Sequence, residues 1–200
     1  MTSFRNCLIF ILLLAAGTYA QAPAPAFKTY EIKGVGSISI PDLMMLQTGS
    51  AIASPTETIF QQKPAAEIKI SSYARVMIDT EAATPGTYRK LTTKLVVPAE
   101  QLRQLDAQSR ADITKGFEGT GLRIVRWDGI SVVTVNGRSA IKTAYLRQLN
   151  QNPPVYAELY QFFNNDRLHT LTISYREQDA SVWKAALARA RDSFTITNIR

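Results

Sequence analysis

Cysteine and histidine are almost absent from this 200-residue chain. The one cysteine is Cys7 and the one histidine is His169. Cys7 lies in a stretch that we expect to be removed, so the remaining domain has no disulfide, thiol nucleophile or cysteine metal ligand. A zinc site would need carboxylates around a single imidazole, which is an uncommon ligand set. We therefore expect no metal and no cofactor, and we interpret His169 as a core-edge side chain that shares a strand face with Leu171.

Several functional motifs are also missing. No serine lies in a Gly-X-Ser-X-Gly turn, and a serine hydrolase would have to use His169 as its base. The glycine-rich residues 116–121 follow a predicted helix and precede a strand, the reverse of the order in phosphate-binding loops, so they indicate a helix stop. The basic residues are dispersed and no nucleic-acid-binding motif is present. We expect nucleic acid not to be a partner.

The first 20 residues have the pattern of a secretory signal peptide. Arg5 gives a basic head, residues 7–16 are almost entirely apolar, and Ala20 is a small residue at the expected cleavage point. An apolar run of about ten residues is too short to cross a bilayer, which needs roughly 20. We predict export to the periplasm or the extracellular space, a Pro/Ala linker over residues 21–26, and no transmembrane segment in the mature chain.

The charge balance is moderately basic. The chain carries 23 basic and 16 acidic residues, and the predicted leader contains only Arg5 among them. Such a balance fits a well-solvated exported domain, with anionic envelope surfaces as an alternative partner. The length of residues 27–200 predicts one domain with a real core. We expect its partner to be a protein or a cell-envelope component.

Alternating apolar and polar residues predict many strands. Residues 27–32 and 36–40 alternate around Lys33-Gly34, as in a hairpin, and residues 58–61 and 67–79 bracket a turn at 63–66. Residues 80–88 contain Pro85-Gly86 and predict a loop. Five further strands are predicted at residues 122–128, 130–135, 138–149, 155–163 and 167–175. Their short connections, Asn136-Gly137 above all, predict antiparallel neighbours.

Two segments have helical periodicity. The first is expected to start with Pro98 as its first residue and to run to about Lys115 before Gly116 stops it. The second is expected to be capped by Asp179, with Trp183 and Leu187 on one apolar stripe. Residues 194–196 are expected to form a last edge strand. The predicted fold is α+β, an antiparallel sheet of about six to eight strands flanked by two main helices.

The order of these segments resembles a known superfamily. The residues that carry the resemblance are Ile40-Pro41-Asp42, Gly137-Arg138-Ser139-Ala140, Tyr156-X-X-X-Tyr160, residues 167–172, Trp183-X-X-X-Leu187 and Asp192-Ser193-Phe194. Together they resemble the PsbP/DcrB-like superfamily, whose fold is shared by the photosystem II extrinsic subunit PsbP and the yeast Ran-binding nuclear import factor. The resemblance implies a PsbP-like α/β/α sandwich over residues 27–196, in proteins that are mostly non-catalytic accessory or assembly factors.

Aromatic and basic residues on the central strands are the candidate ligand-binding or partner-binding site. They are Arg123, Trp127, Lys142, Arg147, Tyr156 and Tyr160. Arginine and tyrosine supply directional bonds and flat contact area. The alternative is that they form cross-strand pairs that stiffen the sheet. Two-residue periodicity predicts that Arg123 and Trp127 share one face.

Two functional hypotheses therefore remain. The first is an exported, non-catalytic accessory or binding protein of the bacterial cell envelope, because no residue spacing matches a known catalytic motif. The second is a carboxylate-dependent hydrolase or isomerase of the envelope that uses Glu158 or Asp128 as acid or base. Two carboxylates within about 5 to 10 Å of each other in one pocket would favour the enzyme.

Overall fold

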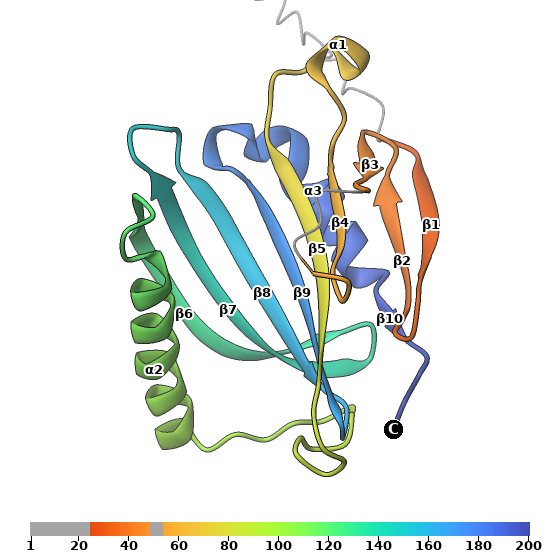
Figure 1. Ribbon diagram of the computed structural model, residues 1–200, viewed down its shortest axis with the longest axis vertical. Helices are drawn as coiled ribbons and strands as arrows, with labels where there is room; N and C mark the ends of the chain where they lie inside the picture. Colours follow the sequence, from red (N-terminus) through yellow and green to blue (C-terminus); the bar gives the residue numbers. More distant parts are fainter. Residues whose placement is uncertain (1–24, 49–53) are drawn as a thin grey trace, which may run out of the picture.

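The computed structural model describes residues 25–48 and 54–200. The predicted signal peptide and most of the predicted linker lie outside the described residues. Two antiparallel sheets dominate the structure (Figure 1). The larger has seven strands in the order β3-β4-β5-β9-β8-β7-β6, and the smaller has three in the order β1-β2-β10. An α+β fold with an antiparallel sheet of six to eight strands is confirmed, and the three-stranded sheet is an addition to it.

The bounds of the elements are as follows. The strands are β1 (Phe27–Ile32), β2 (Gly36–Pro41), β3 (Met44–Leu46), β4 (Thr58–Gln62), β5 (Ala74–Ala82), β6 (Leu122–Val135), β7 (Arg138–Leu149), β8 (Val155–Phe163), β9 (Arg167–Arg176) and β10 (Thr195–Ile196). The helices are α1 (Ala65–Ile68), α2 (Ala99–Phe117) and α3 (Ala180–Asp192), and a short 3₁₀ turn covers Glu177–Asp179.

The small sheet joins the two ends of the described chain. β1 and β2 form the predicted hairpin, in which Gly34 has the positive φ of 74° that glycine tolerates best. β10 pairs with β2 on the other side and is the predicted last edge strand. The two strands approach closely at Gly36, because a Cβ there would lie 2.1 Å from the carbonyl oxygen of Thr195. Only glycine fits this position.

β6 is one long strand, whereas the sequence predicted two strands divided at Asp128-Gly129. Pairing with β7 continues past this point, but the register shifts between Ile124 and Arg126 and again between Trp127 and Gly129. Each shift is a bulge that inserts one extra residue into β6. The first bulge reverses the alternation of the side chains. Arg123, opposite Gln148, and Trp127, opposite Tyr145, therefore fall on different faces, and the prediction that they share one was wrong.

Smaller corrections concern β5 and the helices. The predicted strand over 67–79 begins only at Ala74 and continues to Ala82, because β5 pairs with β9 along this whole length. Helix α1 occupies the start of the predicted strand and ends at Ile68, and the next residue, Lys69, has a left-handed φ of 55°. Helix α2 runs through Gly116 to Phe117, and Pro98 precedes its first residue. Asp179 occupies the N-cap position of α3, as predicted, but its carboxylate makes no capping hydrogen bond and instead accepts the N–H of Tyr73 at 2.9 Å.

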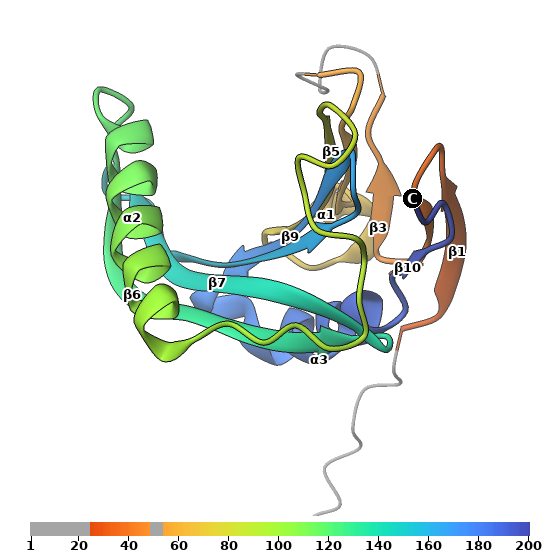
Figure 2. The ribbon, with the colours of Figure 1, turned by 90° about the horizontal axis from the view of Figure 1, so that it is seen from below.

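The two long helices lie on opposite faces of the seven-stranded sheet (Figure 2). We call these the α3 face and the α2 face. The α3 face is the main core, where Trp183 and Leu187 of α3 pack with strand residues such as Val76, Tyr160 and Leu171. On the other face, α2 runs along the edge strand β6 and buries none of its residues. Within the described residues, no helix is long and apolar enough to cross a membrane.

Candidate functional site

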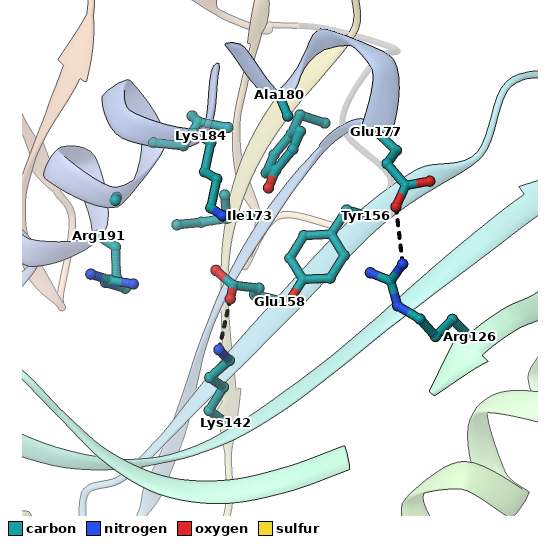
Figure 3. Close-up of a pocket in the computed structure, with 12 residues that line it drawn as sticks. Arg126, Lys142, Tyr156, Glu158, Ile173, Glu177, Ala180, Lys184 and Arg191 are labelled. Atoms are coloured by element: carbon teal, nitrogen blue, oxygen red, sulfur yellow. Dashed lines mark hydrogen bonds and ion pairs between the residues drawn. The ribbon is translucent and has the colours of Figure 1, made fainter. Parts of the chain in front are cut away.

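A cleft of about 450 Å³ opens between α3 and the α3 face of the sheet (Figure 3). Its floor is apolar and includes Ile173 and Leu187. Its rim is charged, with four basic side chains and two acidic ones. These are Arg126, Lys142, Lys184, Arg191, Glu158 and Glu177. The volume lies in the range of small-ligand pockets, and the lining has two more basic than acidic residues.

A chain of polar contacts crosses the inner end of the cleft. The ammonium group of Lys142 lies 2.7 Å from Glu158 Oε1, and the hydroxyl of Tyr160 donates to Glu158 Oε2 at 2.8 Å. The guanidinium of Arg191 in turn donates to the Tyr160 hydroxyl at 3.2 Å. Lys142 and Tyr160 are direct neighbours across β7 and β8, so the sheet register brings them together. The network links the sheet to α3.

Arg126 closes the outer end of the cleft. Its guanidinium bonds Asp128 at 2.8 Å and Glu177 at 3.0 Å, and it lies 5.9 Å from the ring centre of Tyr156. The hydrogen bonds to Asp128 and then to Glu177 raise the pKa of Arg126, so this residue stays cationic. The first bulge of β6 aims Arg126 at this cleft, because it places Arg126 opposite Leu146 on the α3 face.

The tyrosines of the cleft are neutral hydrogen-bonding groups. Burial raises the pKa of Tyr156, and the nearby Glu158 raises it further. Burial likewise raises the pKa of Tyr160, against the lowering effect of its bond from Arg191. Neither phenol is activated as a base or nucleophile near neutral pH, because both activities need a depressed pKa. They supply flat walls and polar hydroxyl groups.

The structure divides the predicted site residues between two faces. Lys142 and Tyr156 line the cleft, and Tyr160 lies beside it. Trp127 and Arg147 share the α2 face, since Trp127 pairs with Tyr145 and stacks on it with ring centres 5.9 Å apart. Arg123 donates to Gln148 at 2.6 Å, near the end of α2. The six residues therefore do not form one surface.

Sequence reasoning missed the cleft residues that come from α3 and from the bulged strand. Lys184, Ala188 and Arg191 follow one another at helical spacings of four and three residues, which puts them on one side of α3. This spacing was a usable signal for a basic helix face. Arg126 offered no such signal, because regular alternation places it on the opposite side from its observed position.

Glu158 and Asp128, the two carboxylates proposed for the enzyme hypothesis, both lie at this cleft, and Glu177 lies there as well. Glu158 and Glu177 line the same cleft, and Asp128 bonds Arg126 at its rim. Each of the three is engaged in an ion pair with a basic residue of the cleft. His169 lies apart from them, fully buried and bonded to Thr80 and Asn164. Residues 25–48 and 54–200 contain no cluster of three or more metal-binding side chains.

Comparison with known proteins shows the fold. No protein-family model and no curated protein matches the sequence. The chain is similar to the solution structure of cyanobacterial PsbP (CyanoP) from Synechocystis sp. PCC 6803, with 13% identity and a TM-score of 0.57 over 90% of this chain and 98% of that chain. The chain therefore has a PsbP-like fold, as the sequence resemblance implied.

Two further solved structures are more distant. A protein from Bacteroides thetaiotaomicron has 6% identity and a TM-score of 0.49, over 84% of this chain and 48% of that chain. A protein of unknown function from Pseudomonas aeruginosa has 12% identity and a TM-score of 0.46, over 84% of this chain and 96% of that chain. The assignment of the fold rests on the PsbP comparison.

Proposed function

We propose that this chain is a non-catalytic binding protein that holds an acidic segment of a partner protein in the cleft between α3 and the sheet. The observation that carries the proposal is the position of Lys184 beside an apolar floor that is walled by tyrosines. Lys184 forms no ion pair with any described residue, so its ammonium group is available to an incoming carboxylate. Lys142 and Arg191 already have acidic partners, Glu158 at 2.7 Å and Asp192 at 2.8 Å, so Lys184 is the cation that the cleft offers to a ligand.

The chemistry of the cleft favours binding over catalysis. A general acid or base must be free to exchange a proton with a substrate. Glu158 is instead held by Lys142 and Tyr160, and Asp128 and Glu177 are both held by Arg126. The family resemblance points in the same direction, since it implies accessory proteins. We therefore prefer an accessory role to the carboxylate-dependent hydrolase or isomerase.

We also propose that the protein functions outside the cytoplasm, in the cell envelope. This location is supported by the basic head and short apolar run of residues 1–20. N-terminal sequencing of the protein recovered from a secreting host should give Gln21 as the first residue. Recovery of the chain with Met1 intact, or with a lipid on Cys7, would contradict this part of the proposal.

The cleft can be tested with a defined probe. A fluorescein-labelled peptide with two glutamates on each side of one tyrosine should bind the purified protein in a fluorescence anisotropy titration. Lys184→Glu should weaken this binding by about tenfold or more, because a hydrogen bond between charged groups contributes about 1.5 to 3 kcal/mol. Binding should also weaken as ionic strength rises, since salt screens exposed charges.

Lys94→Glu is the matched control. Lys94 is an exposed lysine in the segment before α2, away from the cleft, and it undergoes the same change in charge. It should leave the affinity within about twofold of the unmodified protein. Equal loss in both variants would show that only net charge matters, and binding of the matching glutamine peptide with the same affinity would contradict recognition of an acidic segment.

A further inference from the structure

A second pocket, on the α2 face, differs from the cleft in its chemistry. It has a volume of about 460 Å³ and lies where β7 and β8 meet the Asn152–Pro153 turn. Leu122, Leu149, Pro153 and Val155 give it apolar walls, and its charged lining residues are Arg147 and Arg176. It contains no carboxylate among its lining residues, whereas the cleft beside α3 contains two. Its charge is therefore of one sign.

The sheet register brings the two arginines to one row. Arg147 on β7 lies opposite Val155 on β8, and Val155 lies opposite Arg176 on β9. Residues directly opposite each other share a face, so both guanidinium groups rise from the same side with one valine between them. Strands are spaced about 4.8 Å apart, which separates the two backbones by about 10 Å. Two arginine side chains can converge on one anion across this distance.

Among the described residues, Arg147 has no partner that would compete with a ligand. Its side chain forms no hydrogen bond with the described residues and is half-buried, and its charge lowers the pKa of Tyr145 against the raising effect of burial. Arg176 lies 3.5 Å from Asp179, at the long end for a salt bridge. Guanidinium groups bind carboxylates with two parallel hydrogen bonds when geometry allows. The pocket thus combines a free guanidinium with an apolar wall.

We propose that this pocket binds a carboxylate attached to an apolar group, with the carboxylate on Arg147 and Arg176 and the apolar part against Leu149, Leu122 and Val155. Two sources offer this chemistry: a fatty acid, and the free C-terminus of a peptide that ends in an aliphatic residue. The site is separate from the α3 cleft, since none of its lining residues belongs to that cleft. The protein then has one ligand site on each face of its sheet.

Isothermal titration calorimetry of the purified protein separates the parts of this proposal. Octanoate should bind at least about tenfold more tightly than octan-1-ol, which has the same chain without the charge, and octylammonium should bind most weakly. Arg147→Gln should reduce octanoate affinity by about tenfold and leave octan-1-ol unchanged. Leu149→Ser should weaken both ligands, because Leu149 supplies apolar contact and is already 39% exposed in the unliganded protein.

The control is Arg123→Gln, which removes a nearby arginine that does not line the pocket. It should bind octanoate as the unmodified protein does, and so should Lys184→Glu from the opposite face. The source is identified with acetyl-Gly-Gly-Leu and its C-terminal amide: a peptide that binds more tightly than octanoate, but only as the free acid, assigns the site to a chain terminus. Equal affinity for octanoate and octan-1-ol, or unchanged binding by Arg147→Gln, would overturn the proposal.

Discussion

Helices α2 and α3 lie on opposite faces of the same sheet and are attached to it in different ways. The shorter α3 has 13 residues and buries Trp183, Ala186, Leu187 and Ala190. The longer α2 has 19 residues and buries none. Its Asp106 carboxylate accepts the indole N–H of Trp127 at 3.1 Å and the backbone N–H of Ile130 at 2.8 Å.

This contrast separates helix formation from helix packing. α2 had the clearest helical signal in the sequence, but most of its surface faces solvent, so it contributes little buried apolar area. α3 forms one wall of the main core. Stability should therefore depend strongly on α3 and weakly on α2, although α2 is longer.

The largest expected effect comes from Trp183 on α3. Its side chain is fully buried and its indole N–H donates to Ser72 Oγ at 2.9 Å. Trp183→Ala should lower the free energy of unfolding by about 3 to 5 kcal/mol, because it leaves a large cavity. Urea denaturation monitored by circular dichroism measures this change in the free energy of unfolding. An unchanged midpoint would show that α3 is not the helix on which the core depends.

The second effect concerns His169 of β9, whose side chain lies on the α3 face of the sheet opposite Phe162. Burial lowers its pKa to about 4, below the usual 6.5 that it regains on unfolding. Between these values the unfolded chain binds a proton that the folded chain does not. Stability should therefore fall as pH falls from about 6.5 to about 4, by about 3 kcal/mol in total.

The control for this pH effect is His169→Gln, compared with the unmodified protein by denaturation at several pH values between 7 and 4. The variant keeps the other titrating groups, so its stability should fall less over this interval. If stability fell with pH equally in the two proteins, His169 would not contribute to the loss of stability in acid.

The attachment of α2 should have a smaller and more local effect. Asp106→Ala removes hydrogen bonds to a charged group and should cost about 1 to 2 kcal/mol. Amide hydrogen exchange by mass spectrometry should become faster in α2 and the middle of β6, but not in α3. Asp112→Ala is a matched change on the same helix, where the carboxylate bonds only Gln108 among the described residues. Faster exchange in both variants alike would point to loss of helix charge and not to the Asp106 contact.

The smallest effect is expected for Arg123, an exposed residue at the start of β6 that bonds Gln148. Arg123→Glu should change the free energy of unfolding by less than about 0.5 kcal/mol. A loss comparable to that of Asp106→Ala would mean that this end of β6 is held more firmly than its exposure indicates. The same denaturation assay measures both variants.

Much of the fold could be predicted from local pattern. The hairpin at Gly34, the strands that pair around Asn136-Gly137, and the apolar stripe of α3 all follow from short-range periodicity and turn residues. The division of β6 was predicted wrongly because Asp128-Gly129 has the composition of a turn. The long-range pairing with β7 keeps the strand intact there, and pairing partners are not visible in the sequence of one strand.

The candidate site was only half predictable for the same reason. Lys142, Tyr156 and Tyr160 were identified by residue type, and their grouping follows from two regular strands. Arg126 depends on a bulge, and Lys184 depends on where α3 packs. The positions of these two side chains are not determined by nearby sequence. The cleft could therefore be recognised only once the sheet register and the position of α3 were known.

The small sheet sets an order for folding. Ser37 of β2 bonds Thr195 of β10, a partner 158 positions later in the chain. A chain emerges N-terminus first from a ribosome or a translocation channel. The β1–β2 hairpin therefore waits for its β10 partner until almost all of the later residues have emerged. Closing so long a loop is slow. During that interval the edge of β2 that β10 later covers has no strand partner, and an open strand edge favours pairing with other chains.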